Sequence, residues 1–435
     1  MIDAQIVKWS RLEVIFWSLM IGLGEAYIGA YALACGFSER YAGLIATIPL
    51  GAASLAQLFA PKLLRLLKGR RQFVVGCAIA QAMTLFLITG HAIFDRSSPT
   101  LLITVLTLYW LFGLSAGPIW NAWIVSIIPK EQRAHFFSKR GPYHEISVLI
   151  GLVICGFALD RTPDVLLAFS VTFVLAGITR LVSAYSMSRL PDESSAGAIR
   201  LEASSDWGAF IKWLAQKKVM WMILLIGFLN LGVSVGSPFF TPFMLKRMKL
   251  DYDTYMMLIA IPFISRAIAY QYFEQVIRRV GVKSALIPSM VIIALTPFLW
   301  SQFPYVGTIV VFQIIAGIAW TGFEYSILIK QISDFGQAER SRVLTWTNFV
   351  VGACNICGVT IGSQLLGRSP TSADYARVFE ISTMMRLLPI LVVFVIDWQV
   401  SSQYIKRFYI RFVGIRANRG AVSKPILYVD EGGEK

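Results

Sequence analysis

Long apolar segments recur along almost the whole chain, and they constrain its fold more than any other feature. Each is long enough for the roughly 20 residues with which a helix crosses a bilayer. Hydrophobic residues make up 56% of the chain and charged residues only 15%, against about 25% charged residues in a typical soluble domain. The strict alternation of a membrane β-barrel is not seen in the sequence. The backbone hydrogen bonds are therefore expected to be satisfied within helices.

The sequence predicts an all-α polytopic membrane protein with twelve transmembrane helices in two pseudo-symmetric six-helix bundles. The predicted spans are 12–35, 41–61, 72–94, 100–128, 144–160, 165–188, 219–245, 254–276, 282–301, 305–329, 343–366 and 378–400.

The most polar stretch away from the C-terminal tail divides these spans into six and six. It reads RLPDESSAGAIRLEASSD, residues 189–206. The next segment, WGAFIKWLAQKKV at 207–219, combines Trp and aliphatic residues at helical spacing with a basic face, which is typical of a helix lying on the membrane surface. The predicted units are an N-terminal bundle, a cytoplasmic linker with an interfacial helix, a C-terminal bundle and a basic cytoplasmic tail, at 1–188, 189–218, 219–400 and 401–435.

The two predicted bundles share weak sequence similarity in the same order. IGLGE, which ends at Glu25, recurs as IGFLN, which ends at Asn230. Arg180 likewise has a counterpart in Arg386, 206 positions later. An internally duplicated helical membrane protein is typical of transporters, whose binding site lies between the repeats near the middle of the membrane.

The net charge of +15 has a topological explanation. If both termini are cytoplasmic, 29 of the 40 Lys and Arg lie in cytoplasmic segments, 8 lie on the opposite face and 3 lie inside helices. This is the positive-inside bias of polytopic membrane proteins, and no nucleic-acid partner is expected. We predict a multi-pass protein of the cell inner membrane, embedded in the lipid bilayer, with cytoplasmic N- and C-termini.

Motifs of nucleotide and metal chemistry are missing from the sequence. It contains no G-x-x-x-x-G-K-[ST] loop and no H-E-x-x-H, so direct use of ATP and zinc-protease chemistry are not predicted. CNIC at 354–357 places two thiols on one helical face, either as a metal pair or as small residues in helix packing. Packing is favoured because no further ligand is nearby. We expect no metal and no cofactor.

The chain resembles the major facilitator superfamily in its twelve spans, its cytoplasmic termini and its long loop between the sixth and seventh spans. KLLRLLKGRR, residues 62–71, is similar to the cytoplasmic G-x-L-A-D-R-x-G-R-R loop of that family at Gly69, Arg70 and Arg71. Leu66 stands where the family has Asp, so the role of that Asp is not carried over.

A second stretch, PIWNAWIVSIIPKEQRAHFFSKR at 118–140, resembles a segment found in many bacterial members of the superfamily. The resemblance implies that the first, fourth, seventh and tenth helices line a central cavity. It also implies that the second, fifth, eighth and eleventh helices gate this cavity and that the other four support it from outside.

Glu25 lies near the middle of the first predicted span, which otherwise holds no charge between residues 14 and 35. An ionised side chain at that depth costs at least about 2.5–3.5 kcal/mol. Because burial disfavours the charged form, a carboxylate there can take up a proton. We predict that Glu25, on a cavity helix by the resemblance, couples transport to protons. A neutral Glu held by an interhelical hydrogen bond is the alternative.

Further polar residues fall on the other implied cavity helices. Glu324, in the tenth span, is the second candidate for proton coupling. Trp120 and Asn121 in the fourth span and Asn230 in the seventh are predicted to bind substrate, because an aromatic ring and an amide can stack on and hydrogen-bond an organic solute. A lipid-facing position is the alternative for the aromatic residue.

Arg266 lies near the middle of the eighth span. It is predicted to bind a substrate anion, or to form a structural ion pair with Glu25 or Glu324; the sequence does not separate these two roles. Arg180 and Arg386 lie on the implied outer helices, where a packing role is favoured for both.

The predicted function is a secondary active transporter, monomeric and coupled to protons, that moves a small organic solute across a bacterial inner membrane by alternating access. Import and export are both open. An uncoupled facilitator is one alternative, and a membrane-embedded enzyme or sensor on a carrier-like scaffold is another. His144 and Glu145 open the predicted fifth span, where a solvated helix end is expected in preference to a gate contact.

Overall fold

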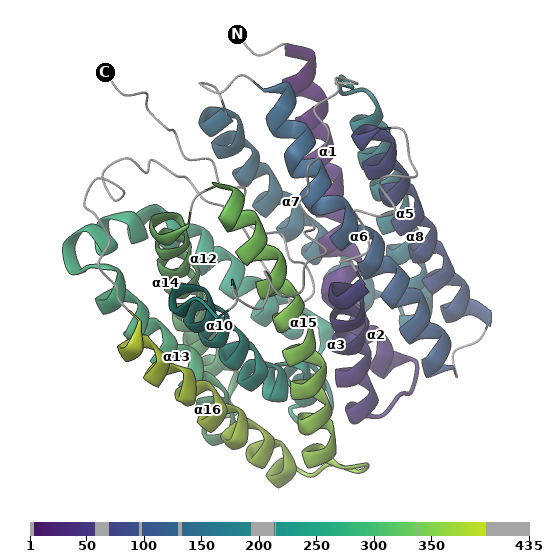
Figure 1. Ribbon diagram of the computed structural model, residues 1–435. Helices are drawn as coiled ribbons and strands as arrows, with labels where there is room; N and C mark the ends of the chain where they lie inside the picture. Colours follow the sequence, from purple (N-terminus) through teal and green to yellow (C-terminus); the bar gives the residue numbers. More distant parts are fainter. Residues whose placement is uncertain are drawn as a thin grey trace.

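The computed structural model describes residues 4–56, 69–94, 98–128, 133–192, 213, 215–335 and 337–396. Regular secondary structure in these ranges is helical, and no strand occurs in them (Figure 1).

The first half of the chain forms α1 (Ala4–Leu23), the short 3-10 helix η1 (Glu25–Tyr27), α2 (Ile28–Ala34), α3 (Glu39–Ala56), α5 (Arg70–Phe94), α6 (Pro99–Ile127), α7 (Arg133–Arg161) and α8 (Val165–Ser188). The second half forms α10 (Lys217–Gly236), the 3-10 helix η4 (Ser237–Phe239), α11 (Phe240–Pro242), the π-helix η5 (Phe243–Arg247), α12 (Tyr252–Val280), α13 (Val282–Gln302), α14 (Val306–Asp334), α15 (Gln337–Leu366) and α16 (Ser372–Val395).

Each of the twelve predicted spans coincides with a helical segment, and the prediction of an all-α polytopic fold is confirmed. The first span is built from α1, η1 and α2, and the seventh from α10, η4, α11 and η5. Ten segments of the described chain are long and apolar enough to cross a membrane, and α3 and α12 are not among them. α12 is less apolar because it carries Arg266 in its middle and Arg278 and Arg279 in its last turn.

The helices form two groups that follow the order of the chain (Figure 1). In the first half α5 packs on α6 and α8, and α1 packs on α7 and α8. In the second half α13 packs on α14 and α16, and α10 packs on α15 and α16. The halves are joined mainly by α3 with α15 and by α7 with α12, and further by η4 and α11 with α2 and α3.

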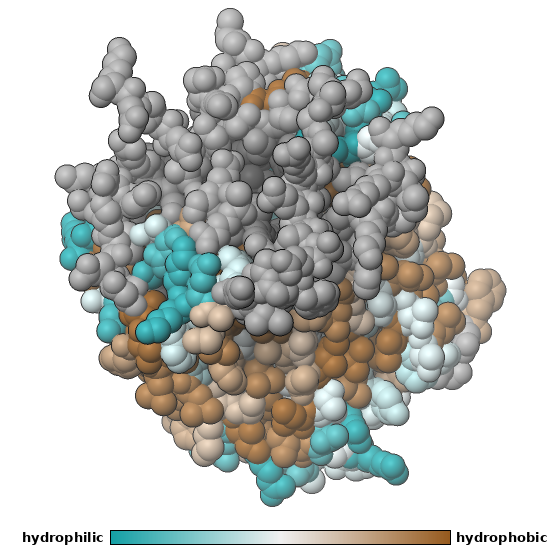
Figure 2. All heavy atoms as spheres, in the orientation of Figure 1, coloured by the Kyte–Doolittle hydropathy of each residue, from teal (hydrophilic) through white to brown (hydrophobic). Residues whose placement is uncertain are grey.

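The outer surface of the molecule suits a bilayer. Figure 2 shows hydrophobic residues gathered over the middle of one face, with hydrophilic residues toward its ends. Large apolar side chains are exposed in both halves, including Leu87, Phe157, Val171, Leu388 and Phe394. Water would make so much exposed apolar surface unfavourable, whereas lipid chains do not.

Polar contacts join the two halves at one end of the molecule. We call the end where α1 begins the near side and the end where α3 and α16 begin the far side. On the far side Arg247 Nη2 donates to Glu39 Oε1 at 2.6 Å, and the Tyr375 hydroxyl donates to Glu39 Oε2. The ring of Phe239, from η4, lies against Gly43 of α3. The far side is therefore closed by contacts between residues of different halves.

Inside each half the helices approach closely at glycines. A Cβ added to Gly22 of α1 would lie 2.7 Å from Leu152 N and 2.8 Å from Gly151 Cα of α7. These atoms belong to the backbone of α7 and cannot move aside as a side-chain end can. Absence of a side chain at Gly22 is therefore what allows α1 and α7 to pack at this distance.

We expect Gly22→Ala to lower the melting temperature of the purified protein in detergent. Overpacking of a core costs about 1–3 kcal/mol, more than the gain of about 1 kcal/mol from the higher helix propensity of Ala. Gly76→Ala is the matched control, because Gly76 lies on α5 with no atom within 4 Å of the added Cβ. Equal melting temperatures for the two variants would contradict the packing described for Gly22.

Candidate functional site

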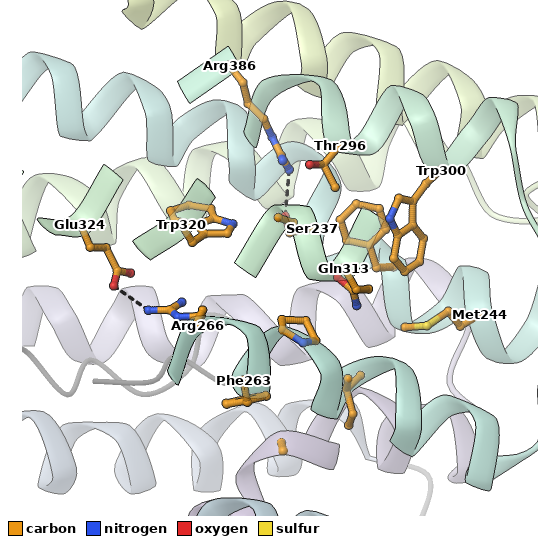
Figure 3. Close-up of a pocket in the computed structure, with 15 residues that line it drawn as sticks. Ser237, Met244, Phe263, Arg266, Thr296, Trp300, Gln313, Trp320, Glu324 and Arg386 are labelled. Atoms are coloured by element: carbon orange, nitrogen blue, oxygen red, sulfur yellow. Dashed lines mark hydrogen bonds and ion pairs between the residues drawn. The ribbon is translucent and has the colours of Figure 1, made fainter. Parts of the chain in front are cut away.

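A cavity of about 160 Å³ lies in the second half of the protein, next to η1 of the first half (Figure 3). Its apolar lining consists of Ala26, Phe240, Met244, Ile259, Pro262, Phe263, Trp300, Ala316 and Trp320. Its polar lining consists of Ser237, Arg266, Thr296, Gln313, Glu324 and Arg386. Aromatic walls with a few polar groups, some of them charged, are typical of a site for a small organic solute.

Arg266, Tyr270 and Glu324 form one buried polar cluster at an end of this cavity. Arg266 Nη2 donates to Glu324 Oε2 at 2.6 Å, and the Tyr270 hydroxyl donates to the same oxygen at 2.8 Å. The other carboxylate oxygen, Oε1, is buried and has no hydrogen-bond partner among the described residues. The predicted site residues Arg266 and Glu324 are thus brought together, as an ion pair that lines the cavity. One acceptor of that pair is left for another molecule.

Tyr270 was not selected from the sequence, although a signal for it exists. It follows Arg266 by four positions in α12, and residues four apart lie on the same face of a helix. A tyrosine placed this way, next to a buried arginine, is a candidate partner for the same carboxylate.

Glu145 of α7 adds a second carboxylate to this cluster from the other half. Both of its carboxylate oxygens are buried and have no hydrogen-bond partner among the described residues. Its charge interacts with those of Arg266 and Glu324. Because α7 of the first half packs on α12 of the second, this cluster of two acids and one arginine spans the interface.

The expectation of a solvated helix end at His144 and Glu145 is wrong, since both are buried. His144 Nδ1 is hydrogen-bonded to Ser18 Oγ of α1 at 2.6 Å, and its ring stacks on Trp17 with centroids 5.1 Å apart. The reason is that α7 begins at Arg133, well before the predicted start of the span at residue 144. The apolar pattern cannot detect a polar helical extension.

Arg386 of α16 reaches the cavity from the side opposite Arg266 and points toward Ser237 (Figure 3). It is 2% exposed. Its Nη1 donates to Ile293 O at 2.9 Å, and its Nη2 donates to Ser237 Oγ at 2.8 Å and to Val233 O at 3.3 Å. The sequence favoured a packing role on an outer helix, but the side chain is long enough to line the cavity as well.

Glu25 does not line the cavity, although the next residue, Ala26, does. It is 7% exposed in η1, and the Tyr109 hydroxyl donates to its Oε2 at 2.9 Å. Its Oε1 has no hydrogen-bond partner among the described residues. Glu25 therefore points into the interior of the first half, and the structure separates it from the cluster that contains Glu324.

Trp120 and Asn230, two other predicted substrate-binding residues, are not among the described residues that line the cavity. Trp120 lies in the near-side core of the first half. The guanidinium carbon of Arg140 lies over its indole ring, 4.4 Å from the ring centroid. Asn230 Nδ2 donates to Ile226 O of its own helix at 2.7 Å. The side chain of Asn121 lies outside the described residues.

The loop motif residues Gly69, Arg70 and Arg71 lie at the start of α5. Arg71 Nε is 3.5 Å from Asp192 Oδ2, and its Nη1 donates to Leu190 O at 3.3 Å, just after α8. A carboxylate partner for this motif thus comes from the end of the sixth span, while position 66 lies outside the described residues.

The described residues contain no group of three or more His, Cys, Asp or Glu side chains that could hold a metal ion. The stretch GLSAG at 113–117 matches the G-x-S-x-G pattern of serine hydrolases, but it lies inside the continuous helix α6. A nucleophilic serine of that type requires a sharp turn between a strand and a helix, so this match carries no catalytic site.

The sequence profile of the Major Facilitator Superfamily matches residues 14–365. The chain belongs to this superfamily of membrane transporters. No curated protein matches the chain in sequence.

Solved transporter structures share the fold. A mutant of the nucleoside transporter NupG has a TM-score of 0.70 at 13% identity, over 90% of this chain and 99% of that chain. A bacterial homologue of the iron transporter ferroportin, in an inward-facing state, has a TM-score of 0.69 at 12% identity, over 94% and 100%. A D-xylose–proton symporter has a TM-score of 0.67 at 13% identity, over 89% and 96%. The family and these neighbours are transporters, and the alternative of a membrane-embedded enzyme has no support from them.

We expect Arg266→Gln and Glu324→Gln each to lower the melting temperature, because each leaves one charge of the pair without its partner. A hydrogen bond to a charged group contributes about 1.5–3 kcal/mol. The double variant is expected to be more stable than the sum of the two losses predicts, since neither Arg266 nor Glu324 is then left charged without the other. Thermal unfolding in detergent measures all three variants.

Arg71→Gln serves as the control, because Arg71 and Asp192 are 35% and 23% exposed and such a pair contributes only about 0–1 kcal/mol. Strictly additive losses at Arg266 and Glu324 would show that the two side chains do not interact as described.

Proposed function

We propose that this protein is a monomeric secondary active transporter that moves a small organic solute across the bacterial inner membrane by alternating access. The cavity carries the proposal: it lies beside the interface of the halves, with aromatic walls and charged groups that have unused hydrogen-bonding capacity. Membership of the superfamily supports transport as the activity. The distribution of Lys and Arg supports cytoplasmic termini, so that the near side is the cytoplasmic one.

Alternating access requires that contacts on one side of the membrane break while contacts on the other side form. The far-side contacts of Glu39 with Arg247 and Tyr375 are suited to this, since they are polar and join different halves. Arg247 is part of an exposed contact, and exposed ion pairs are weak, about 0–1 kcal/mol. This ion pair therefore adds little to the cost of opening the far side, and the binding of a solute can shift the balance between two states.

We assign proton coupling to Glu25 within this proposal. Glu25 is a buried carboxylate whose described hydrogen bond comes from a neutral hydroxyl, that of Tyr109. It also lies in η1, where the first span departs from α-helical geometry, immediately before the cavity-lining Ala26. Protonation removes the charge of Glu25 and would change the contacts of η1 with the neighbouring helices. Because Ala26 belongs to η1 and lines the cavity, a shift of η1 would alter the cavity wall.

The cluster of Glu145, Arg266 and Glu324 is a second place for a proton. Two ionised carboxylates beside one arginine leave one negative charge unbalanced, and one bound proton makes the cluster neutral. Because Glu145 belongs to the first half and the other two residues to the second, its protonation state would also affect contact between the halves.

An uncoupled facilitator is the remaining alternative for the mechanism. Uptake under an imposed pH gradient distinguishes the facilitator from a proton-coupled carrier, because the gradient drives solute accumulation only in the coupled carrier. The nucleoside, iron and xylose named for the structural neighbours are substrates of those proteins, and at 12–13% identity they do not select a substrate for this chain.

We expect Glu25→Gln to abolish accumulation driven by a pH gradient and to leave solute exchange intact. Exchange between two pools of the same solute needs no net proton movement, whereas coupled accumulation does. The measurement uses proteoliposomes and a solute chosen because it stabilises the purified protein in a thermal-shift screen.

Glu380→Gln is the matched control, since it removes one carboxylate from α16 outside the cavity lining. It should accumulate solute as the wild type does. Full gradient-driven accumulation by Glu25→Gln would refute its coupling role, and the same assay on Glu145→Gln and Glu324→Gln would then test the second site.

Bridging the far side should stop transport reversibly. Glu39→Cys and Arg247→Cys are combined in a background without the five native cysteines, and the two thiols are joined by a bis-methanethiosulfonate reagent. Uptake into proteoliposomes is expected to fall at least tenfold and to return after reduction. Each single-cysteine variant treated with the same reagent should keep its uptake. An unchanged rate in the bridged protein would exclude far-side opening as a step of the cycle.

A further inference from the structure

Equivalent helix contacts inside each half show which residues of the two halves correspond, and they do so better than sequence similarity. A Cβ added to Gly151 of α7 would lie 2.7 Å from Leu19 O, and one added to Gly358 of α15 would lie 2.6 Å from Leu231 O. Leu19 and Leu231 are 212 positions apart. α1 and α10 therefore correspond with a shift of 212, although the similarity of IGLGE and IGFLN suggests 205.

The same shift aligns the breaks in the first and seventh spans. Gly24 precedes η1 and lies against Phe173 of α8, while Gly236 precedes η4 and lies against Phe379 of α16. Glu25, the first residue of η1, therefore corresponds to Ser237, the first residue of η4. The pairing of Glu25 with Asn230 is wrong. It rested on the short similarity of IGLGE and IGFLN, whereas the helix breaks align Glu25 with Ser237.

Arg180 and Arg386 occupy equivalent positions in this alignment. Arg180 Nε donates to Gln81 Oε1 of α5 at 2.8 Å, and Arg386 Nη1 donates to Ile293 O of α13 at 2.9 Å. Gln81 and Ile293 again differ by 212 positions. Each arginine thus bridges its outer helix to the equivalent neighbour in its own half.

The charge around these two arginines differs. In the first half Arg180 interacts electrostatically with Glu13 and, more weakly, with Glu25, and all three residues are buried. In the second half the equivalent of the Glu25 carboxylate is the neutral hydroxyl of Ser237. The described hydrogen bonds of Arg386 all go to neutral oxygens, and no carboxylate of the described residues forms an ion pair with it. The positive charge of Arg386 is therefore uncompensated, at the wall of a cavity.

Buried donors of this cavity wall lack an acceptor among the described residues at the end away from Arg266 and Glu324. They are Nε of Arg386 and Nε1 of Trp300, side chains that are 2% and 1% exposed. Figure 3 shows Arg386 and Trp300 away from the end that holds Arg266 and Glu324. At that other end Glu324 Oε1 is an acceptor with no partner among the described residues, and the charge of Arg266 is already met by Glu324.

We propose that the solute of this cavity is a small organic anion whose oxyanion is bound by Arg386 and Trp300 and whose hydroxyl or amino group donates to Glu324. The aromatic walls, Phe240, Phe263 and Trp320, would hold its apolar part. When one bound proton makes the cluster of Glu145, Arg266 and Glu324 neutral, Arg386 leaves the site with one net positive charge, which favours a monoanion such as a carboxylate. This inference rests on the proposed transport function, because it names the class of solute that the transporter carries.

The test compares acids with their uncharged amides on the full-length protein in detergent. Lactate, benzoate and mandelate are titrated against lactamide, benzamide and mandelamide, with phenyl phosphate as the phosphate source of an oxyanion, and the melting temperature is recorded. At least one anion is expected to stabilise the wild type saturably at a concentration at least tenfold below that of its amide. A response to phenyl phosphate alone would support the same site with a phosphate in place of a carboxylate.

Ser237→Glu is the decisive variant, since it places beside Arg386 the kind of carboxylate that Glu25 provides beside Arg180. It should lose anion stabilisation, as should Arg386→Gln, while each elutes as a folded protein in size-exclusion chromatography. Gln302→Glu adds the same charge at an exposed position of α13 and should respond like the wild type. If Arg386→Gln does not fold, Ser237→Glu alone decides.

Three results would overturn the proposal: amides that stabilise as well as their acids, an undiminished anion response in Ser237→Glu, or no response to any anion of the panel. If proteoliposomes accumulate an uncharged solute in that case, transport stands and only the anion assignment fails. If they transport no solute of a broad metabolite panel, the proposed function itself fails.

Discussion

A charge buried in a membrane-spanning bundle needs a compensating partner, and the rest of this structure depends on how that requirement is met. Water is not there to solvate the ion, and breaking a buried pair leaves an unpaired charge at a cost of about 3–5 kcal/mol. Glu13 with Arg140 and Glu324 with Arg266 meet the requirement inside the protein. Arg386 has only neutral oxygens as described partners. The paired charges hold helices together, and the uncompensated one gives the cavity its chemical character.

The two halves also differ in the charges that surround their equivalent buried arginines, Arg180 and Arg386. Both keep an arginine on the outer helix and a helix break at the equivalent glycine, Gly24 or Gly236. Only the first half keeps a carboxylate after that glycine, and the arginine of that half interacts electrostatically with Glu13 and Glu25. The second half has Ser237 there, and the space beside Arg386 opens into the cavity. This difference between the two halves underlies our proposal of a proton site in the first half and a solute site in the second.

The fold was predictable from the sequence because spacing of apolar residues and breaks between them are local properties. The site was predictable only in part. Arg266 and Glu324 were found because a charge in an apolar span stands out, and they do meet in the cavity. Glu145 was misjudged, because its burial depends on polar residues that extend α7. Glu25 lies on the predicted helix but faces the interior of its own half, since the rotation of a helix about its axis depends on packing partners. Trp300 and Ser237 have no sequence signal, because an uncharged residue in an apolar span looks the same whether it faces lipid or a cavity.

The 3-10 turns after Gly24 and Gly236 interrupt the first and seventh spans at equivalent points. In a regular helix each turn is bonded to the next, so the rod moves as one piece. At a break that ladder is incomplete, and the two segments of a span can tilt separately. Ala26 and Ser237 sit at these joints and touch the cavity. A solute bound there would contact the break in each span, where a small displacement changes the tilt of the neighbouring helical segment.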